Sequence, residues 1–190
     1  MRTSAILLAL LLLCGCGLLS PVKDQAVHHL LEPVAPDRPL TAAAPAIAVS
    51  RAALPDYLDC EQLVTRRDGV LVVSDFDLWA EPFDVAISRV VAGNLSRLTG
   101  STNILPVERF TTLEYTDLLE LRITQFEPDA THTLMLQGTW KLQPVTGKEV
   151  GSHFFRIAVP MPSNSSTAKE RVSAMNQAIL RLARDILAAR

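Results

Sequence analysis

The stretch LVTRRDGVLVV, residues 63–73, decides the fold of this chain, because it carries a clear strand signal and a helix signal follows it directly. Two runs of apolar and β-branched residues flank Asp68-Gly69, a pair that suits a tight turn with positive φ. The stretch therefore predicts a β-hairpin, and with it a sheet.

An amphipathic helix is predicted directly after the hairpin. Pro82 suits the first turn of a helix, where its missing N–H is tolerated, and Gly100 suits the end. Between them, apolar residues recur with the helical period and form one face. These residues are Phe83, Ile87, Val90, Val91, Leu95 and Leu98.

Beyond Gly100 the apolar residues alternate with polar ones, which is the period of a half-buried strand. Three such segments, residues 119–124, 134–142 and 155–159, are joined by short connections, so we expect antiparallel neighbours. A capping box over residues 167–170 then opens a last helix with its own apolar face.

Two short strands, residues 25–31 and 46–49, are predicted ahead of the hairpin, with a proline-rich loop between them. The whole order is strands, helix, three strands and helix. It predicts an α/β fold of the α+β kind. We expect a single compact domain with a mixed, mostly antiparallel sheet of about five to six strands, flanked by two main amphipathic helices.

The N-terminus has the features of a bacterial export signal. Arg2 precedes an unbroken run of nine apolar residues, fewer than the roughly 20 that a bilayer-spanning helix needs. LCGC, residues 13–16, resembles a lipobox, and Cys16 fits as the acylated cysteine because Gly15 precedes it. A plain signal peptide is the alternative, but no A-x-A-like cleavage pattern is present.

We therefore expect three segments: residues 1–15 are a lipoprotein signal peptide, residues 16–25 a lipidated tether, and residues 26–190 a periplasmic domain. The tether reaches at most ~35 Å, so the domain stays close to its membrane. Gly17 stands where an Asp is the usual inner-membrane retention signal of enteric-type bacteria, which favours the outer membrane.

The composition excludes several classes of protein. Without residues 1–15 the chain carries 17 basic and 20 acidic residues, and it has no basic stripe for nucleic acid. Cys60 is then the single free thiol, so no internal disulfide can form.

Signatures of catalysis and nucleotide binding, such as G-x-S-x-G, H-E-x-x-H and a complete P-loop, do not occur in the sequence. The four histidines are spread over strands and loops, so we expect neither a metal site nor a cofactor. Asp56, Asp59 and Cys60 are the residue types of an acid–thiol site. No base accompanies the thiol, however, and a structural role is favoured.

A second acidic and aromatic cluster, residues 75–82, precedes the first predicted helix. Its carboxylates suit the positive end of the helix dipole, and a structural role is again favoured over a carboxylate pair. Phe76 and Trp79 are expected to pack the entry of the chain onto the sheet.

Two motifs resemble those of a known family. LPDYLD, residues 54–59, and WAEP, residues 79–82, are similar to segments of the auxiliary lipoproteins of ABC-type intermembrane transport systems, the family of paraquat-inducible protein C. The order of elements matches over nearly the whole mature chain. Cys60-Glu61 departs from the family, whose members usually carry a basic residue followed by Pro or another small or polar residue. The candidates for a partner contact or a fold signature are Leu54, Tyr57, Asp59, Trp79, Glu81 and Pro82.

The resemblance implies a non-enzymatic lipoprotein on the periplasmic face of the outer membrane. Its partner would be a periplasmic protein with mammalian-cell-entry (MCE) domains that forms a conduit for phospholipid or another hydrophobic molecule. The implied role is to dock that conduit at the outer membrane and to help maintain membrane integrity. Two alternatives stay open: a carrier that holds an acyl chain in an apolar pocket, and an enzyme using Asp56, Asp59 or Cys60. The oligomeric state also stays open, and a homo-oligomer around the conduit mouth is compatible with the docking role.

Overall fold

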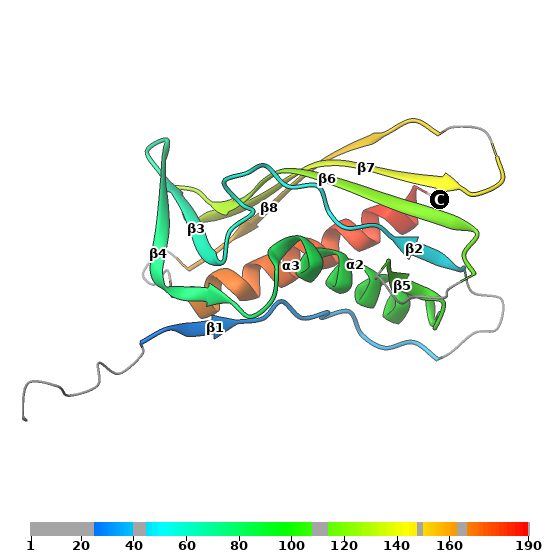
Figure 1. Cartoon of the computed structure of the whole chain (residues 1–190), viewed down its shortest axis with the longest axis horizontal. Helices are drawn as coiled ribbons and strands as arrows, with labels where there is room; N and C mark the ends of the chain where they lie inside the picture. The colour runs from blue at the N-terminus through cyan, green and yellow to red at the C-terminus, as the bar shows by residue number, and fades with distance from the viewer. Residues whose placement is uncertain (1–24, 40–44, 108–113, 148–149, 163–166, 190) are drawn as a thin grey trace, which may run out of the picture.

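The computed structural model describes residues 25–39, 45–107, 114–147, 150–162 and 167–189. These residues form an α+β domain in which two helices cover one face of a sheet, and a smaller sheet stands at one end (Figure 1). The predicted α+β class with two main helices is therefore confirmed. Neither helix of the described part is long and apolar enough to cross a bilayer.

The larger sheet is built on β6 (Asp117–Pro128), β7 (Thr133–Pro144) and β8 (His153–Pro160), an antiparallel meander that confirms the three predicted segments. Two short strands, β2 (Ile47–Val49) and β5 (Ile104–Pro106), extend the sheet beside β6 in parallel orientation. The sequence analysis does not predict β5, a strand of three residues.

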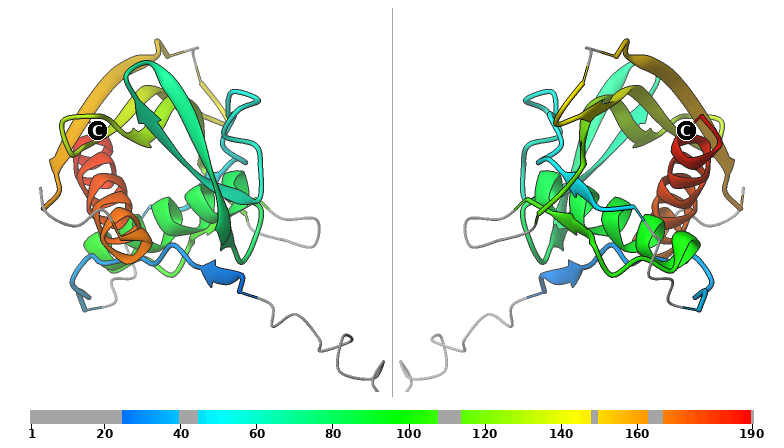
Figure 2. Two further views of the ribbon diagram at one scale, coloured as in Figure 1. Left: turned by 90° about the vertical axis from the view of Figure 1, so that its left-hand side faces the viewer. Right: turned by 90° about the vertical axis from the view of Figure 1, so that its right-hand side faces the viewer.

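The smaller sheet contains the hairpin of β3 (Gln62–Arg67) and β4 (Val70–Trp79), with β1 (Val27–His29) parallel to the end of β4. The turn residues Asp68 and Gly69 have φ of 49° and 79°, which confirms the predicted turn. Figure 2 shows this sheet from its own side, standing across the end of the larger sheet. The strands thus divide between two sheets, a division that the alternation pattern does not reveal.

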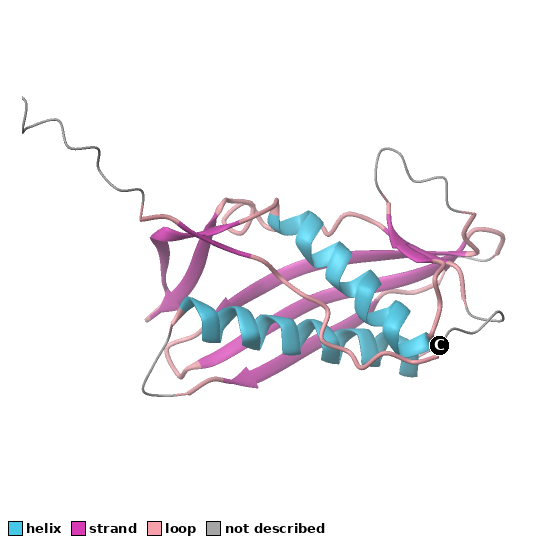
Figure 3. Ribbon diagram, turned by 90° about the horizontal axis from the view of Figure 1, so that it is seen from below, coloured by secondary structure: helices cyan, strands magenta, loops and turns pink. Residues whose placement is uncertain are grey.

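The helices lie together on one face of the larger sheet, as Figure 3 shows from below. α2 (Phe83–Thr99) ends where Gly100 takes a left-handed conformation, φ 71°, and donates its N–H to the carbonyl of Ser96 at 2.8 Å. α3 (Ala168–Ala188) begins with the predicted capping box between Thr167 and Glu170. Local signals therefore place both helices correctly.

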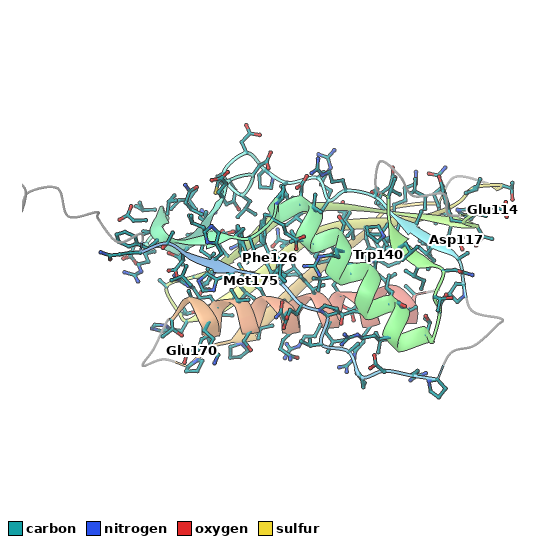
Figure 4. All side chains as sticks on the ribbon, turned by 60° about the horizontal axis from the view of Figure 1, so that its bottom comes forward. Glu114, Asp117, Phe126, Trp140, Glu170 and Met175 are labelled. Atoms are coloured by element: carbon teal, nitrogen blue, oxygen red, sulfur yellow. The ribbon has the colours of Figure 1, made fainter. Side chains whose placement is uncertain are left out.

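The core lies between the helices and the sheet. Burying a side chain of the size of Leu or Ile contributes about 1.5–3 kcal/mol, so this layer supplies most of the driving force for folding. In Figure 4, Phe126 lies in the half of the core nearer the hairpin, and Trp140 lies in the opposite half. The largest fully buried side chains include Leu95, Leu119, Ile123, Phe126, Leu134, Leu136 and Ile179.

An irregularity in β6 shapes the candidate site described below. The pairing of β6 with β7 shifts between Ile123 and Gln125, so the regular alternation of inward and outward side chains is interrupted. Beyond the shift, the consecutive residues Phe126 and Glu127 are both fully buried.

The prediction for residues 75–82 is partly wrong. β4 continues through Asp75, Phe76 and Asp77 to Trp79, so these residues belong to a strand and not to a helix entry. Trp79 is buried as expected, whereas Phe76 is 53% exposed and does not pack onto the sheet. The strand continues because β1 pairs with its last three residues, a long-range contact that local patterns do not show.

Candidate functional site

The two sequence motifs lie next to each other although about 20 residues separate them. The loop of residues 54–59 precedes β3, and residues 79–82 connect β4 to α2. The backbone N–H of Trp79 donates to the carbonyl of Glu61 at 2.6 Å and ties the two segments together. A surface hollow of about 360 Å³ lies where they meet, lined by His28, Asp59, Cys60, Glu61, Leu78, Trp79, Ala80, Glu81, Pro82 and Phe83.

The LPDYLD loop is a compact turn on the core. The N–H of Leu58 donates to the carbonyl of Pro55 at 2.9 Å, and Leu58 is buried. Leu54 and Tyr57 are partly buried and pack against the core. The side chains of Asp56 and Asp59 are exposed, so their carboxylates are available to solvent or to a partner.

A buried carboxylate, Glu127, holds this loop. Its Oε1 accepts from Nε and Nη2 of Arg66, both at 2.8 Å, and its Oε2 accepts from the hydroxyl of Tyr57 at 3.1 Å and from the N–H of Phe126 at 2.9 Å. The Arg66 guanidinium also lies over the Tyr57 ring, 5.6 Å from its centroid. Both carboxylate oxygens are therefore fully satisfied, as a buried charge requires.

This environment changes the acidity of Tyr57. Burial, followed by the nearby charge of Glu127 and the hydrogen bond to it, raises the pKa of Tyr57 to about 12. The phenol is therefore kept protonated, because an ionised oxygen at this place would face the Glu127 carboxylate. Tyr57 is thus a hydrogen-bond donor that fixes the loop, and it is not suited to act as a base near neutral pH.

The WAEP segment is held mainly by aromatic stacking. Trp79 stacks on Phe83 with ring centroids 4.6 Å apart, and Phe83 stacks on Phe126 with centroids 5.5 Å apart. Such pairs are worth about 0.5–1.5 kcal/mol each beyond the burial of their area. The two motifs are therefore held by neighbouring residues of β6. Tyr57 of LPDYLD contacts Glu127, and Trp79 of WAEP is linked through Phe83 to Phe126.

Glu81 has a positioning role in this segment. Its carboxylate is paired with Arg89, whose Nε lies 3.1 Å from Oε1. Nη2 of Arg89 also donates to the backbone carbonyl of Leu31 at 2.8 Å. Pro82 caps the start of α2, and its carbonyl accepts from the N–H of Ala86 at 3.0 Å. The motif therefore fixes both the start of the helix and the segment that follows β1.

A third polar cluster surrounds Asp77 on β4. Oδ1 contacts Nε2 of His29 at 2.9 Å, and Oδ2 accepts from Nη2 of Arg171 at 3.3 Å and from the hydroxyl of Ser74 at 3.0 Å. Burial opposes the charge of Asp77, but the hydrogen bonds from His29 and Ser74 and the charge of Arg171 outweigh it and lower the pKa of Asp77. The cluster ties β1, β4 and α3 together.

The hydrogen bonds of the Cys60 thiol go to the backbone. Cys60 is a half-buried free thiol whose Sγ donates to the carbonyls of Tyr57 and Gln62, at 3.7 and 3.5 Å. A catalytic cysteine needs an adjacent base, and these contacts are backbone acceptors. Across the described ranges, no group of three or more His, Cys, Asp and Glu side chains is arranged to hold a metal ion.

Sequence reasoning did not predict the contacts made by five charged residues of this region, Arg66, Asp77, Arg89, Glu127 and Arg171, although Asp77 belongs to the acidic cluster of residues 75–82 described above. One signal was available for Glu127, since it lies between Phe126 and Pro128 at the end of an apolar strand. The sequence offers no signal for its partners, because they are distant along the chain. Cys16, the predicted lipidation site, lies outside the described residues.

Comparisons with known proteins bear on the family and the fold of the chain. The family model described as "ABC-type transport auxiliary lipoprotein component" matches residues 29–187. A crystal structure of an uncharacterized protein is 21% identical, with a TM-score of 0.64 over 80% of this chain and 96% of that chain. A Xanthomonas campestris protein of the DUF330 family is 18% identical, with a TM-score of 0.64 over 83% of this chain and 91% of that chain. Both structures support the fold alone.

No curated protein matches the chain at a significant level. The family model, however, spans both motifs, the buried anchors on β6 and both helices. The chain therefore belongs to the family of ABC-type transport auxiliary lipoprotein components.

Proposed function

We propose that this protein is a lipid-anchored, non-enzymatic subunit of an MCE/ABC-type lipid transport system. Its role is to dock the periplasmic conduit at the outer membrane and so to help maintain the membrane barrier. The family match over residues 29–187 carries the proposal. Acylation of Cys16 and a tether of about ten residues would hold the domain at its leaflet.

The use of the motif residues supports a docking role. Tyr57, Trp79 and Glu81 make contacts within the chain that fix the shape of one end of the domain. A subunit that positions a partner needs such a rigid shape, whereas a catalytic subunit needs a reactive group with a base or a metal.

The end of the domain opposite the hairpin is the candidate surface for the conduit. β1, where the tether joins, lies at the hairpin end, so the opposite end is directed away from the anchoring leaflet (Figure 1). Exposed apolar side chains mark interaction surfaces when they gather. On the strands and loops of this opposite end they are Leu105, Val107, Tyr115, Val145 and Val150.

Site-specific photocrosslinking tests the docking role. A photoreactive phenylalanine analogue replaces Val145 in the full chain expressed in its own bacterium, and adducts are identified by mass spectrometry. We expect an MCE-domain protein in the adduct. A matched chain with the analogue at Val72, in the hairpin, should not give this adduct. Repeated recovery of unrelated proteins from the Val145 position would overturn the proposal.

The structure favours docking over the carrier alternative. The hollow between the motifs is lined by the carboxylates of Asp59, Glu61 and Glu81 as well as by apolar residues. An acyl chain would leave these groups without water, which is costly. Native mass spectrometry of gently purified protein distinguishes the two roles, since a carrier retains phospholipid at one per chain and a docking subunit does not.

A further inference from the structure

We propose that the β3–β4 hairpin and β1 form a membrane-contact surface that rests in the headgroup region of the anchoring leaflet. The inference deepens the proposed function and rests on it, because it takes Cys16 as the lipid anchor. It assigns an occupant, a phospholipid surface, to the apolar side chains at the tethered end. We call this set of side chains the hairpin surface: Val27, Val70, Val72, Val73 and Phe76.

The hairpin surface is apolar on both sides of the hairpin. Val72 is paired with Thr65 and Val73 with Val64, and consecutive residues of a strand point to opposite faces. Yet Val72 is 42% exposed and Val73 is 52% exposed. A two-stranded hairpin in water normally hides one apolar face and shows a polar one. Apolar side chains on both faces suit a hairpin whose end lies in an apolar or interfacial medium.

The short tether keeps the hairpin surface close to the membrane. β1 begins at Val27, and Val27 is paired with Asp77, next to Phe76 on β4. Residues 16–25 reach at most ~35 Å from the acylated cysteine. The leaflet therefore lies within the reach of a short chain that enters the domain at the hairpin end, as Figures 1 and 2 show for β1. The tether does not hold the opposite end of the domain close to the leaflet in this way.

Backbone hydrogen bonding limits how deeply the hairpin can enter the membrane. β4 is paired with β3 on one side, but on the other side β1 covers only Asp77–Trp79. Residues 70–76 therefore have no strand partner on that side among the residues that the structure describes. Unpaired backbone groups cannot enter the hydrocarbon core, but water and headgroups satisfy them at the interface. We thus place the hairpin in the headgroup region and not across the bilayer.

The charges near the turn point to binding through apolar contact. Arg67 is exposed and paired with Val70, so it is placed to reach phosphate groups while the valine side chain is buried in lipid. Asp68 and Asp75 are also exposed and offset this attraction. Binding should therefore depend only weakly on salt and on the anionic lipid content.

Depth-dependent quenching of tryptophan tests the inference. The full lipidated chain carrying Phe76→Trp is reconstituted in vesicles of phosphatidylethanolamine and phosphatidylglycerol (3:1) with brominated acyl chains. The matched control is Phe154→Trp, which is 66% exposed on β8. The signal of Trp79 and Trp140 is subtracted with the unsubstituted chain. We expect at least twofold stronger quenching at position 76 than at 154, with little change between 50 and 500 mM salt.

The anchor is tested separately in the same vesicles. If the unsubstituted chain floats with the vesicles and Cys16→Ser does not, the anchoring part of the proposed function holds. Equal or absent quenching at position 76 then overturns the membrane-contact surface alone. If the unsubstituted chain does not float, the anchoring proposal and the inference both fail. A protein adduct from a photoreactive residue at position 76 would also overturn the inference, since it would assign the surface to a protein. Thermal melting confirms that each variant is folded.

Discussion

The two family motifs are attached to neighbouring residues of β6 by opposite means. LPDYLD is held by a polar cluster in which the buried charge of Glu127 meets Arg66 and Tyr57. WAEP is held by stacked rings from Trp79 through Phe83 to Phe126. The polar cluster fails as a unit, because removing one partner leaves another buried without compensation. The aromatic stack weakens in proportion to the contact that is lost.

The largest loss of stability is expected when Arg66 is substituted. Arg66→Met leaves Glu127 buried without its countercharge and should lower the free energy of unfolding by about 3–5 kcal/mol. Urea denaturation followed by circular dichroism measures the change as a lower midpoint. Arg67→Met is the control: Arg67 is exposed and adjacent, and its loss should change stability by no more than about 0.5 kcal/mol. Equal effects of the two substitutions would show that the polar cluster is not the anchor.

A smaller loss of stability is expected when the aromatic stack is weakened. Phe83→Leu keeps an apolar side chain at the site but removes two stacking contacts, and it should cost about 1–3 kcal/mol. The matched substitution Phe76→Leu lies on an exposed side chain and should be nearly neutral in solution. If Phe83→Leu costs as much as Arg66→Met, the contrast between the two attachments is wrong.

Tyr57→Phe should cost about 1 kcal/mol near neutral pH, because Glu127 loses one hydrogen bond and keeps those from Arg66 and Phe126. The difference should depend on pH. Since folding raises the pKa of Tyr57 from about 10 to about 12, its contribution is complete below pH 10 and is lost as the pH rises toward 12. Stability of the two proteins, measured from pH 8 to 11.5, should converge at the alkaline end. A constant difference would contradict the contact with Glu127.

The smallest loss of stability is expected when Glu81 is substituted. Its ion pair with Arg89 is partly exposed, and Arg89 keeps its hydrogen bond to Leu31 without it. Glu81→Gln should therefore cost about 0.2–1 kcal/mol, less at high salt. Chemical denaturation at 50 and 500 mM salt gives both values. A loss above that of Phe83→Leu would place the main anchor of WAEP on the charge and not on the stack.

Local signals explain which parts of the fold the sequence predicts. Asp68-Gly69 identifies the hairpin, Gly100 and the capping box at Thr167 place the helix ends, and period-two alternation identifies β6, β7 and β8. Each of these signals acts within a few residues of the chain.

The anchors of the candidate site could not be predicted in the same way. Arg66 and Glu127 are 61 residues apart, and Asp77 and Arg171 are 94 residues apart. Beyond the shift in β6 after Ile123, three consecutive residues are buried, Phe126, Glu127 and Pro128, where alternation would expose at least one of them. The motifs themselves were identified by resemblance, and only the folded chain shows that they are held by neighbouring residues of β6, Glu127 and Phe126.

The contact between Arg89 and Leu31 has a mechanical consequence. In the proposed docking role, a lipid would hold one side of the domain and a partner the other, and a pull between them would enter the fold at β1. A pull along β1 loads its three pairs with β4 together, in shear, and the next bond along the chain is the one from Arg89 to Leu31. Glu81 fixes Arg89 in place. If β1 were pulled away, the contact of Arg89 with Leu31, which Glu81 of the WAEP motif holds in place, would stop the detachment from continuing into the domain.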